Sequence, residues 1–458
     1  MRRSSLDAVV PDRELFDLID AELAFQDHDL NLIAAANYLS PAVQRAMDPR
    51  LQNIHSEGYP TRRYHEGQAA ADAIEQLAIE RAKTLFGAEH ANVQPYRGTM
   101  ANLAAAMAVL KPGDTLLGLE CRSGGHYTTS TQAHCIARMF RVVPYTVSAD
   151  TLTIDYDRLR ACARVERPGA IFCGDTAYPR RWDYARLAEI AAETGAVLIA
   201  DISQIAGLIA GGALPNPMPY VGIATAATYK TLRGPRSGLI LCRKGHAAAI
   251  DRAVYPTCQG GPNIMLLAGL AAALLEAGTP EFREYTRRVV ENAAALAEAL
   301  LKRGFEIVTR GTETHACLVD LREKGVPGNL AAKRLAQARI ICNGNQIPFD
   351  PSPPVRPSGL RLGTAAVSTL GMVEADMVTI SDLVANAFDH IHDDNALREL
   401  AVQVRVLRQR YPLNGHPPIA VGPTQHTLDQ AASMNASPTQ HSSSHRIQIH
   451  AAHAEVSP

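Results

Sequence analysis

The sequence predicts an α/β protein with a mainly parallel sheet and a smaller α+β domain after it. Amphipathic helix patterns alternate with short apolar runs through most of the chain. Such alternation is typical of a parallel sheet with helices on both faces. The run 195–201 is apolar until it ends in a carboxylate, as expected of a wholly buried strand. With 458 residues, the chain suits one large domain and a smaller companion.

We expect four segments along the chain. Residues 1–66 should form an acidic amphipathic helix, over about the first 30 residues, and an extended polar arm. Residues 67–303 should form the large α/β domain, and residues 304–412 the small C-terminal α+β domain. The segment 413–458 is rich in Gly, Pro, Ser, Gln and His. It buries too little apolar area to offset the cost of ordering, so we expect it to be disordered.

Periodicity and composition place the individual helices and strands. The expected helices cover 69–86, 98–110, 183–194, 263–277, 280–303, 328–337 and 373–391. The expected strands cover 115–120, 169–175, 196–201, 221–228, 237–242, 305–309, 315–321, 339–343 and 360–363.

Composition excludes several classes of function. A net charge of -1 and a pI near 7.0 argue against a nucleic-acid partner. No run approaches membrane-spanning length, and the eight cysteines show no CxxC spacing, so we expect a cytoplasmic, reducing setting without a membrane. Histidines are frequent after residue 413, but nothing fixes their geometry, so no dedicated metal site is expected. Small-molecule chemistry is the remaining default.

Lys230 is the first candidate catalytic residue. It follows a run of small and β-branched residues and enters a turn bounded by Gly234 and Pro235. An amine among apolar neighbours loses hydration of its charged form, so its pKa falls and it can attack an aldehyde near neutral pH. The alternative interpretation is a solvated surface lysine.

Asp201 ends the buried run upstream of Lys230. Ligands of open α/β sheets lie outside the carboxyl ends of the strands, and a desolvated aspartate needs a cationic partner. A protonated pyridine nitrogen would be that partner, so Asp201 and Lys230 together suggest pyridoxal phosphate. The alternative for Asp201 is a helix N-cap.

Two glycine-containing turns could bind the cofactor phosphate. Gly98 and Thr99 open an alanine-rich helix, whose positive end suits an anion. Gly260 and Gly261 open another apolar helix, and either add amides to the same phosphate or form only a loop.

From about residue 30 to 412 the chain resembles serine hydroxymethyltransferase. The stretches that carry the resemblance are Glu57-Gly58-Tyr59-Pro60, Arg63-Tyr64, Glu75-Gln76-Leu77-Ala78-Ile79, Asn92-Val93-Gln94-Pro95, Gly124-Gly125-His126, Lys230-Thr231-Leu232, Gly234-Pro235-Arg236, Gln259-Gly260-Gly261-Pro262 and Ser358-Gly359-Leu360-Arg361-Leu362-Gly363-Thr364. The resemblance implies a fold-type I pyridoxal-phosphate-dependent transferase with a seven-stranded type of sheet, acting as a homodimer or tetramer.

The resemblance also implies a role for individual residues. Lys230 would condense with the cofactor aldehyde, Asp201 would pair with the pyridine nitrogen, His126 would stack on the ring, and Thr176 would bond the phenolic oxygen. Gln204 stands where the family has a histidine beside the cofactor. Arg361 would clamp the substrate carboxylate, which suits its planar fork. Glu57 would be the acid/base, and His55, Tyr64 and His65 would meet the substrate; a solvated turn carboxylate is the alternative for Glu57.

The departures from the family pattern lie mainly where the substrate would bind. They are Ala35 and Ala36 for Ser-Glu, His55 and His65 for two tyrosines, Gln204 and Tyr229 for histidines, Arg97 for a serine, Tyr127 for a leucine and Phe349 for an asparagine. The cofactor chemistry therefore looks intact and the substrate pocket rebuilt. Imidazoles in place of phenols could admit a bulkier amino acid or relay protons. Losing the asparagine amide at Phe349 argues against strong tetrahydrofolate binding.

The sequence thus predicts an enzyme that makes or breaks the Cα–Cβ bond of a β-hydroxy amino acid and exchanges an aldehyde. Aldolase, transaldolase and hydroxymethyl transfer all fit, with α-methylserine among the possible substrates. A tetrahydrofolate-dependent serine-to-glycine enzyme and a catalytically silent oligomer partner are the alternatives.

Overall fold

The computed structural model describes residues 12–413. Residues up to Phe25 belong to one compact unit and residues from Gln26 onward to another. The helix expected near the start is α1, Arg13–His28, which has no buried residue. The tail prediction falls on residues 414–458, outside the described residues.

The helices of the described chain are α1 Arg13–His28, α2 Pro41–Ala46, α3 Ala69–Phe86, α4 Gly98–Val109, α5 Tyr127–Ser130, α6 Cys135–Met139, α7 Tyr156–Glu166, α8 Tyr184–Thr194, α9 Ala206–Ala210, α10 Ala247–Arg252, α11 Ile264–Glu276, α12 Pro280–Lys302, α13 Gly328–Gln337, α14 Ala365–Thr369, α15 Glu374–Asp389 and α16 Asp394–Gln409. The strands are β1 Leu30–Asn31, β2 Gly58–Tyr59, β3 Arg62–Arg63, β4 His90–Asn92, β5 Thr115–Leu119, β6 Arg141–Tyr145, β7 Ala170–Gly174, β8 Val197–Asp201, β9 Ile223–Ala227, β10 Gly238–Cys242, β11 Glu306–Ile307, β12 Ala316–Asp320, β13 Ile340–Ile341, β14 Asn343–Asn345 and β15 Gly359–Gly363.

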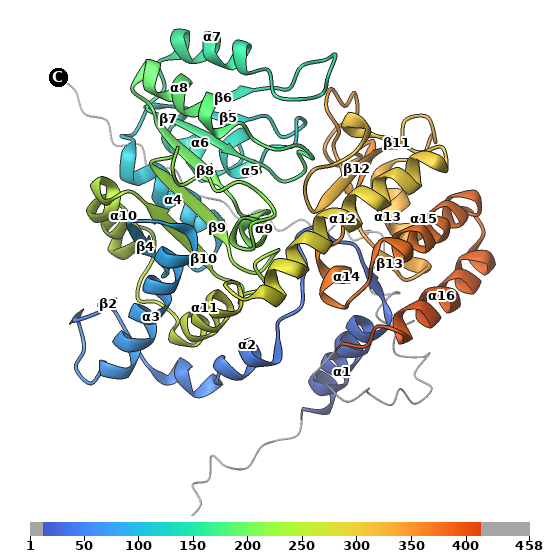
Figure 1. Cartoon of the computed structure of the whole chain (residues 1–458), viewed down its shortest axis with the longest axis horizontal. Helices are drawn as coiled ribbons and strands as arrows, with labels where there is room; N and C mark the ends of the chain where they lie inside the picture. Colours follow the sequence, from blue (N-terminus) through green and yellow to red (C-terminus); the bar gives the residue numbers. More distant parts are fainter. Residues whose placement is uncertain (1–11, 414–458) are drawn as a thin grey trace, which may run out of the picture. The chain divides into compact units, whose positions relative to one another are not determined.

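The large sheet has seven strands in the order β4-β10-β9-β8-β7-β5-β6 (Figure 1). All pairings from β9 to β6 are parallel, and β10 runs antiparallel to both of its neighbours. The prediction of a mainly parallel sheet is therefore confirmed.

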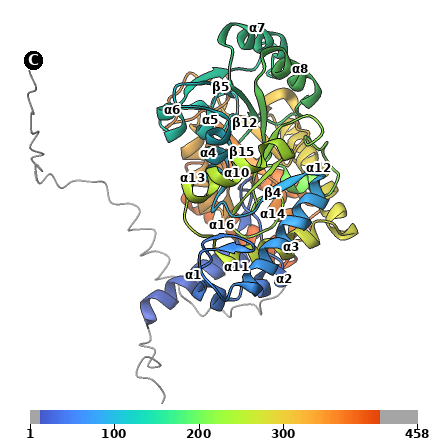
Figure 2. The ribbon, with the colours of Figure 1, turned by 90° about the vertical axis from the view of Figure 1, so that its left-hand side faces the viewer.

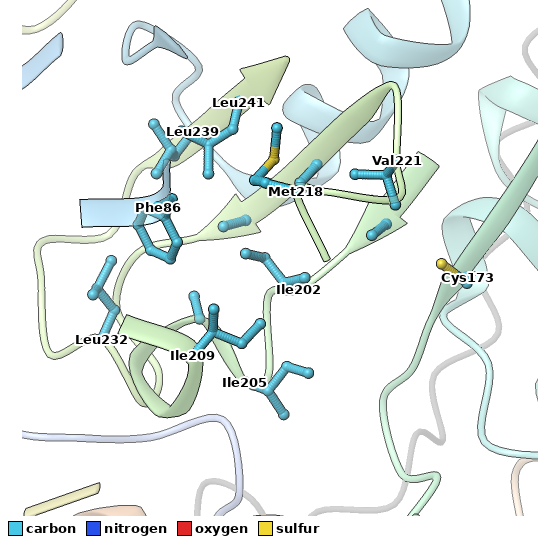
Figure 3. Packing of buried hydrophobic residues seen from close by; sticks show 14 of the residues in the cluster. Phe86, Cys173, Ile202, Ile205, Ile209, Met218, Val221, Leu232, Leu239 and Leu241 are labelled. Carbon is cyan, nitrogen blue, oxygen red and sulfur yellow. The ribbon is translucent and has the colours of Figure 1, made fainter. Parts of the chain in front are cut away.

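Both faces of this sheet are buried, because alternate residues of each strand enter different cores. Leu198 and Ala200 of β8 pack into the core that includes α3, α7 and α8, whereas Ile199 packs into the core with α4 and α6. In the close view of the first core, Phe86 at the end of α3 lies against Leu239 of β10 (Figure 3). Helices thus cover both faces, as the alternation in the sequence predicts.

The smaller sheet is antiparallel, in the order β11-β12-β15-β14. It shares one core with α13, α15 and α16, and that core also contains Leu30 and Leu32 from the arm. Helix α12 runs from the region of the large sheet to that of the small one (Figure 1). Val289 packs into the large core and Leu300 into the small one. This helix therefore contributes to both hydrophobic cores.

Helix α11 is strongly apolar and packs along α3 and against α2 (Figure 2). Its burial among these helices explains its composition. Among residues 12–413, no single helix is both long and apolar enough to cross a membrane; α11 and α12 pass that test only as a pair bent by 85°.

Several elements differ from their predicted form. Strand β6 was not expected, because it contains Pro144, a residue that strands accept mainly at a sheet edge, and β6 is an edge strand. The strand expected over 305–309 stops at Ile307, because Thr309 and Arg310 have φ of 60° and 57°. The strand expected over 339–343 is two strands in two different sheets, β13 and β14.

Candidate active site

Four polar side chains meet at the carboxyl edge of the large sheet. His126 follows β5, Asp175 follows β7, Asp201 ends β8 and Lys230 follows β9. These strands are adjacent in the order β9-β8-β7-β5. The carboxyl ends of parallel strands share one edge, so residues far apart in sequence converge there.

A cavity of about 270 Å³ opens at this edge. It is lined by Arg97, Gly98, Thr99, His126, Tyr127, Asp201, Ser203, Ala227, Tyr229 and Lys230. Five of the predicted catalytic and cofactor residues therefore line one cavity. Arg97, Tyr127 and Tyr229, three of the departures from the family pattern, also face it.

Lys230 is buried, with 6% of its surface exposed, so it is not a solvated surface lysine. Burial lowers its pKa to about 8, although the charge of Asp201 opposes the shift. Its backbone carbonyl accepts a hydrogen bond from Asn37 Nδ2 at 2.9 Å, which ties the turn to the arm. The lowered pKa raises the neutral, and hence nucleophilic, fraction of the amine near physiological pH far above that of an exposed lysine.

Asp201 is fixed by two donors. Its Oδ2 accepts from Asn102 Nδ2 at 2.7 Å and its Oδ1 from the Ser203 amide at 2.9 Å. These two hydrogen bonds fix the orientation of the carboxyl group at the end of β8. Asp201 does not cap the next helix, since α9 begins at Ala206 with Ile205 at its N-cap.

Asn102 is a site residue that the sequence analysis missed. Its Oδ1 accepts from Thr225 Oγ1 at 2.5 Å, and its Nδ2 also donates to Thr128 Oγ1 at 3.1 Å. Thr128 Oγ1 in turn lies 2.7 Å from His126 Nδ1, so one amide links the aspartate to the histidine. The available signal was a polar residue one turn after Gly98 in an apolar helix.

His126 is mostly enclosed, and desolvation lowers its pKa to about 4. The imidazole is therefore neutral at physiological pH. A neutral ring can lie against a planar aromatic ligand without adding a charge beside Lys230.

The start of α4 forms an anion-binding corner. Arg97 at its N-cap makes no side-chain capping bond, so the first amides of the helix are not used by a cap. A Cβ on Gly98 would lie 3.1 Å from both the Ala227 Cβ and Ser203 Oγ, so a glycine allows this close approach. Ser203 and Thr99 add hydroxyl groups to the same corner.

Thr176 and Arg361 lie together beside the cavity lining. Arg361 is buried; it donates to the Thr176 carbonyl at 2.6 Å and to Asn343 Oδ1 at 3.1 Å. Burial lowers the Arg361 pKa to about 10, so the guanidinium is still charged at neutral pH. The buried Thr176 hydroxyl oxygen has no hydrogen-bond partner. An unsatisfied buried hydroxyl calls for a polar ligand atom beside it.

Four predicted cofactor residues lie outside the lining of this cavity: Thr176, Gln204, Gly260 and Gly261. The Gln204 side chain is buried, and its Oε1 lies 3.2 Å from His315 Nε2. A Cβ on Gly261 would lie 3.0 Å from the Cα of Glu57, so the turn at 260–261 packs against the arm. The amides of that turn therefore do not join the α4 corner within one chain.

The predicted substrate residues of the arm meet one another, not Lys230. The distance from His55 Nε2 to Glu57 Oε2 is 3.6 Å, and the rings of His55 and His65 have centroids 5.0 Å apart. Tyr64 is 79% exposed, and its ring contacts the His65 ring edge-on. None of these four residues lines the Lys230 cavity.

The site accommodates a phosphorylated aromatic aldehyde. The α4 corner would suit a phosphate and Asp201 a protonated ring nitrogen, and the unpaired Thr176 hydroxyl, which lies outside the cavity lining, would be a partner for a ring oxygen. A buried lysine with a lowered pKa completes the set. Fold and site together define a pyridoxal-phosphate-dependent enzyme.

Comparisons with known proteins identify the family. The model for "Serine hydroxymethyltransferase" matches residues 9–384. A serine hydroxymethyltransferase of Acidobacterium capsulatum is 46% identical over 413 residues, covering 90% of this chain and 97% of that protein. That of Desulfotalea psychrophila is 45% identical, covering 89% and 96%, and that of Acidothermus cellulolyticus 48% identical, covering 88% and 96%. The chain belongs to the serine hydroxymethyltransferase family and is a pyridoxal-phosphate-dependent transferase.

Proposed function

We propose that this enzyme makes and breaks the Cα–Cβ bond of β-hydroxy amino acids with a substrate pocket unlike that of a standard serine hydroxymethyltransferase. One observation carries the proposal. The cavity around Lys230 keeps the lysine, the aspartate, the histidine and the anion corner, whereas His55 and His65 have replaced tyrosines on the arm. Aldolase, transaldolase and hydroxymethyl transfer share this bond chemistry and differ in the aldehyde acceptor.

The roles of the protein groups follow from their environments. The cofactor, when bound, supplies an electron sink for the carbanion left at Cα. Lys230 offers a neutral amine, and Asp201 holds a negative charge at the end of β8. Arg361 has a charged guanidinium to hold the substrate carboxylate. Glu57, which does not line the cavity of its own chain, moves the proton of the substrate β-hydroxyl in the site of a neighbouring chain of the oligomer.

The altered positions favour a substrate with an extra substituent on Cα. Ala35 and Ala36 stand where the family pattern has a serine and a glutamate, so a hydroxyl and a carboxylate are absent. The adjoining Asn37 is retained and bonds Tyr285 Oη at 2.8 Å as well as the Lys230 carbonyl. Asn37 therefore holds the backbone of this stretch in place, while the side chains of Ala35 and Ala36 are smaller than those of the family pattern. α-Methylserine is the expected test substrate.

A substrate screen tests this proposal. Serine, threonine, allothreonine and α-methylserine are compared by initial rate of aldehyde release. We expect the α-substituted or longer substrates to exceed serine. A clear preference for serine over all three would contradict the altered pocket.

The second candidate is a tetrahydrofolate-dependent glycine/serine hydroxymethyltransferase. The names of the relatives favour it. Phe349 opposes it: the ring is 50% exposed, its φ is 56°, and it offers no amide to a pterin. Formaldehyde transfer from serine with and without tetrahydrofolate separates the two. Strict folate dependence would reject our preferred version.

A catalytically silent oligomer partner is the third candidate. It predicts no absorbance change on mixing with pyridoxal phosphate and no label on Lys230 after borohydride reduction. The retained cavity favours the opposite result for both measurements.

We also propose that the enzyme is a homodimer or tetramer in the cytoplasm. Helix α1 exposes apolar side chains, among them Phe16 at 54% and Leu18 at 53%, and the arm cluster lies outside its own cavity. All eight cysteines, which lie in the described residues, are free thiols, as suits a reducing compartment. Mixing Lys230→Ala with Glu57→Gln chains should restore part of the activity if sites are shared between chains. An active monomer on gel filtration would contradict the oligomer.

A further inference from the structure

His55, Glu57 and His65 are arranged as a set of metal ligands. One ligand atom from each lies within 4.8 Å of the other two, and His55 Nε2 lies 3.6 Å from Glu57 Oε2. The ligand atoms of a tetrahedral zinc site lie roughly 3.4 Å apart, because each bond is about 2.1 Å long. Small side-chain rotations would close the remaining gap. The sequence analysis assigned both histidines to the substrate and expected no metal.

The backbone that carries this set is braced by buried polar groups. Strands β2 and β3 form a hairpin, and the Tyr64 amide continues it by donating to the Glu57 carbonyl at 2.9 Å. That pairing places residue 65 beside residues 55 and 57. The positions of residues 55, 57 and 65 in the sequence would not by themselves bring the three side chains together.

Arg63 holds the hairpin from the inside. Its guanidinium, 2% exposed, pairs with Glu75 at 2.6 Å. It also donates to the carbonyls of Ser56 and Gly58, which flank Glu57. The Gln68 amide nitrogen reaches the His55 carbonyl at 3.3 Å. The backbone on both sides of Glu57 is therefore tied to a buried side chain, and the backbone of His55 is tied to Gln68.

We propose that His55, Glu57 and His65 bind one divalent transition-metal ion, with Zn²⁺ as the preferred ion. Two imidazoles and one carboxylate match the ligand chemistry of zinc, and three protein ligands leave a fourth position open. His55 is 72% and Glu57 32% exposed at the side chain, so an oxygen of water or of a small hydroxy or carboxylate ligand can reach the ion. The metal site shares Glu57 with the proposed reaction, so zinc binding is measured directly and separately from activity: transfer activity without zinc binding overturns the metal site alone.

The test uses the full-length holoenzyme and Zn²⁺ as the probe. Because six histidines follow residue 413, the reference protein carries His→Asn at 416, 426, 441, 445, 450 and 453. Calorimetric titration of the reference should show one Zn²⁺ per chain. His65→Asn and Glu57→Gln should each remove that binding step, while His392→Asn, at an exposed histidine outside the cluster, should keep it.

Replacing one proposed ligand by another zinc ligand tests whether residue 65 itself binds the ion. His65→Cys should restore Zn²⁺ binding, because a thiolate is a good zinc ligand. With Co²⁺, the reference should show visible bands of a four- or five-coordinate ion without a thiolate charge-transfer band, and His65→Cys should add that band. Zn²⁺ binding that survives both His65→Asn and Glu57→Gln, or its absence from the reference, would overturn the proposal.

Discussion

The cavity around Lys230 and the cluster of His55, Glu57 and His65 on the arm differ in the elements that carry them and in their burial. The cavity residues are carried by adjacent strands of a sheet buried on both faces, and their polar atoms are mostly paired with one another. The arm residues are carried by a two-residue hairpin and are partly exposed. A substitution in the cavity leaves a buried group without its partner, whereas one on the arm changes mainly what the surface offers to a ligand. The departures that would change substrate choice most, His55 and His65, lie on the arm.

The largest expected effect is at Lys230. Lys230→Ala should abolish both activity and borohydride-stable cofactor labelling, because no other described amine lines the cavity. Peptide mass mapping of the reduced holoenzyme measures the label. Lys111→Ala, at an exposed lysine, is the matched control and should retain both. Labelling at another lysine in wild type would refute the assignment.

A substitution of Glu57 on the arm should also have a large effect, but on the catalytic rate and not on cofactor attachment. Glu57→Gln should lower kcat roughly 100-fold or more, the usual contribution of a general acid/base, without changing the cofactor spectrum. Glu66→Gln alters an exposed carboxylate on the same arm and should have little effect. Equal losses in the two variants would mean that charge on the arm, not the position of Glu57, matters.

Two buried aspartates at neighbouring strand ends allow a matched comparison, because Asp201 lines the Lys230 cavity and Asp175 does not. Asp201→Asn should weaken cofactor binding by about 2 kcal/mol, roughly 30-fold, as expected on removing one partner of a buried charge pair. Asp175 differs, because burial raises its pKa to about 7 and Trp182 Nε1 already donates to it at 2.9 Å. It is partly protonated at neutral pH, so Asp175→Asn should cost clearly less. Equilibrium dialysis of both variants tests the order; the reverse order would contradict the role of Asp201.

The pH dependence of cofactor binding reports on Lys230 directly. Its pKa is lowered to about 8, so the neutral amine dominates above pH 8 and is lost below it. The rate at which apoenzyme captures pyridoxal phosphate should therefore fall about tenfold per pH unit below 8 and level off above it. Stopped-flow absorbance measures this rate. A rate that keeps rising toward pH 10 would mean that the amine behaves as an exposed lysine.

The sequence was sufficient to predict five of the seven strands of the large sheet. Apolar runs placed β5, β7, β8, β9 and β10, because strands buried on both faces leave little choice of residue. Asp201 and Lys230 were found because a charged group at the end of such a run is unusual. Asn102 was not found, since its importance comes from a contact with Asp201 across 99 residues of sequence.

The contacts that the arm residues and Gln204 make could not be predicted from apolar runs in the sequence. The hairpin pairing of Glu57 with Tyr64 brings His55 and His65 together, and no periodicity of so short an element signals it. Gln204 was expected at the cofactor but bonds His315, a residue of the small sheet region 111 positions away. Such contacts depend on how the two sheets are joined, and α12 joins them.

The smallest expected effect tests whether the arm sets substrate choice. His55→Tyr/His65→Tyr restores the phenols of the family pattern while leaving the Lys230 cavity unchanged. If the imidazoles make room for a substituent on Cα, the ratio of kcat/KM for α-methylserine to that for serine should fall roughly tenfold, the usual discrimination for one methyl group. The cofactor spectrum should not change, because neither position lines the cavity. An unchanged ratio would place substrate choice in Ala35 and Ala36, on the stretch of arm that Asn37 ties to the Lys230 turn.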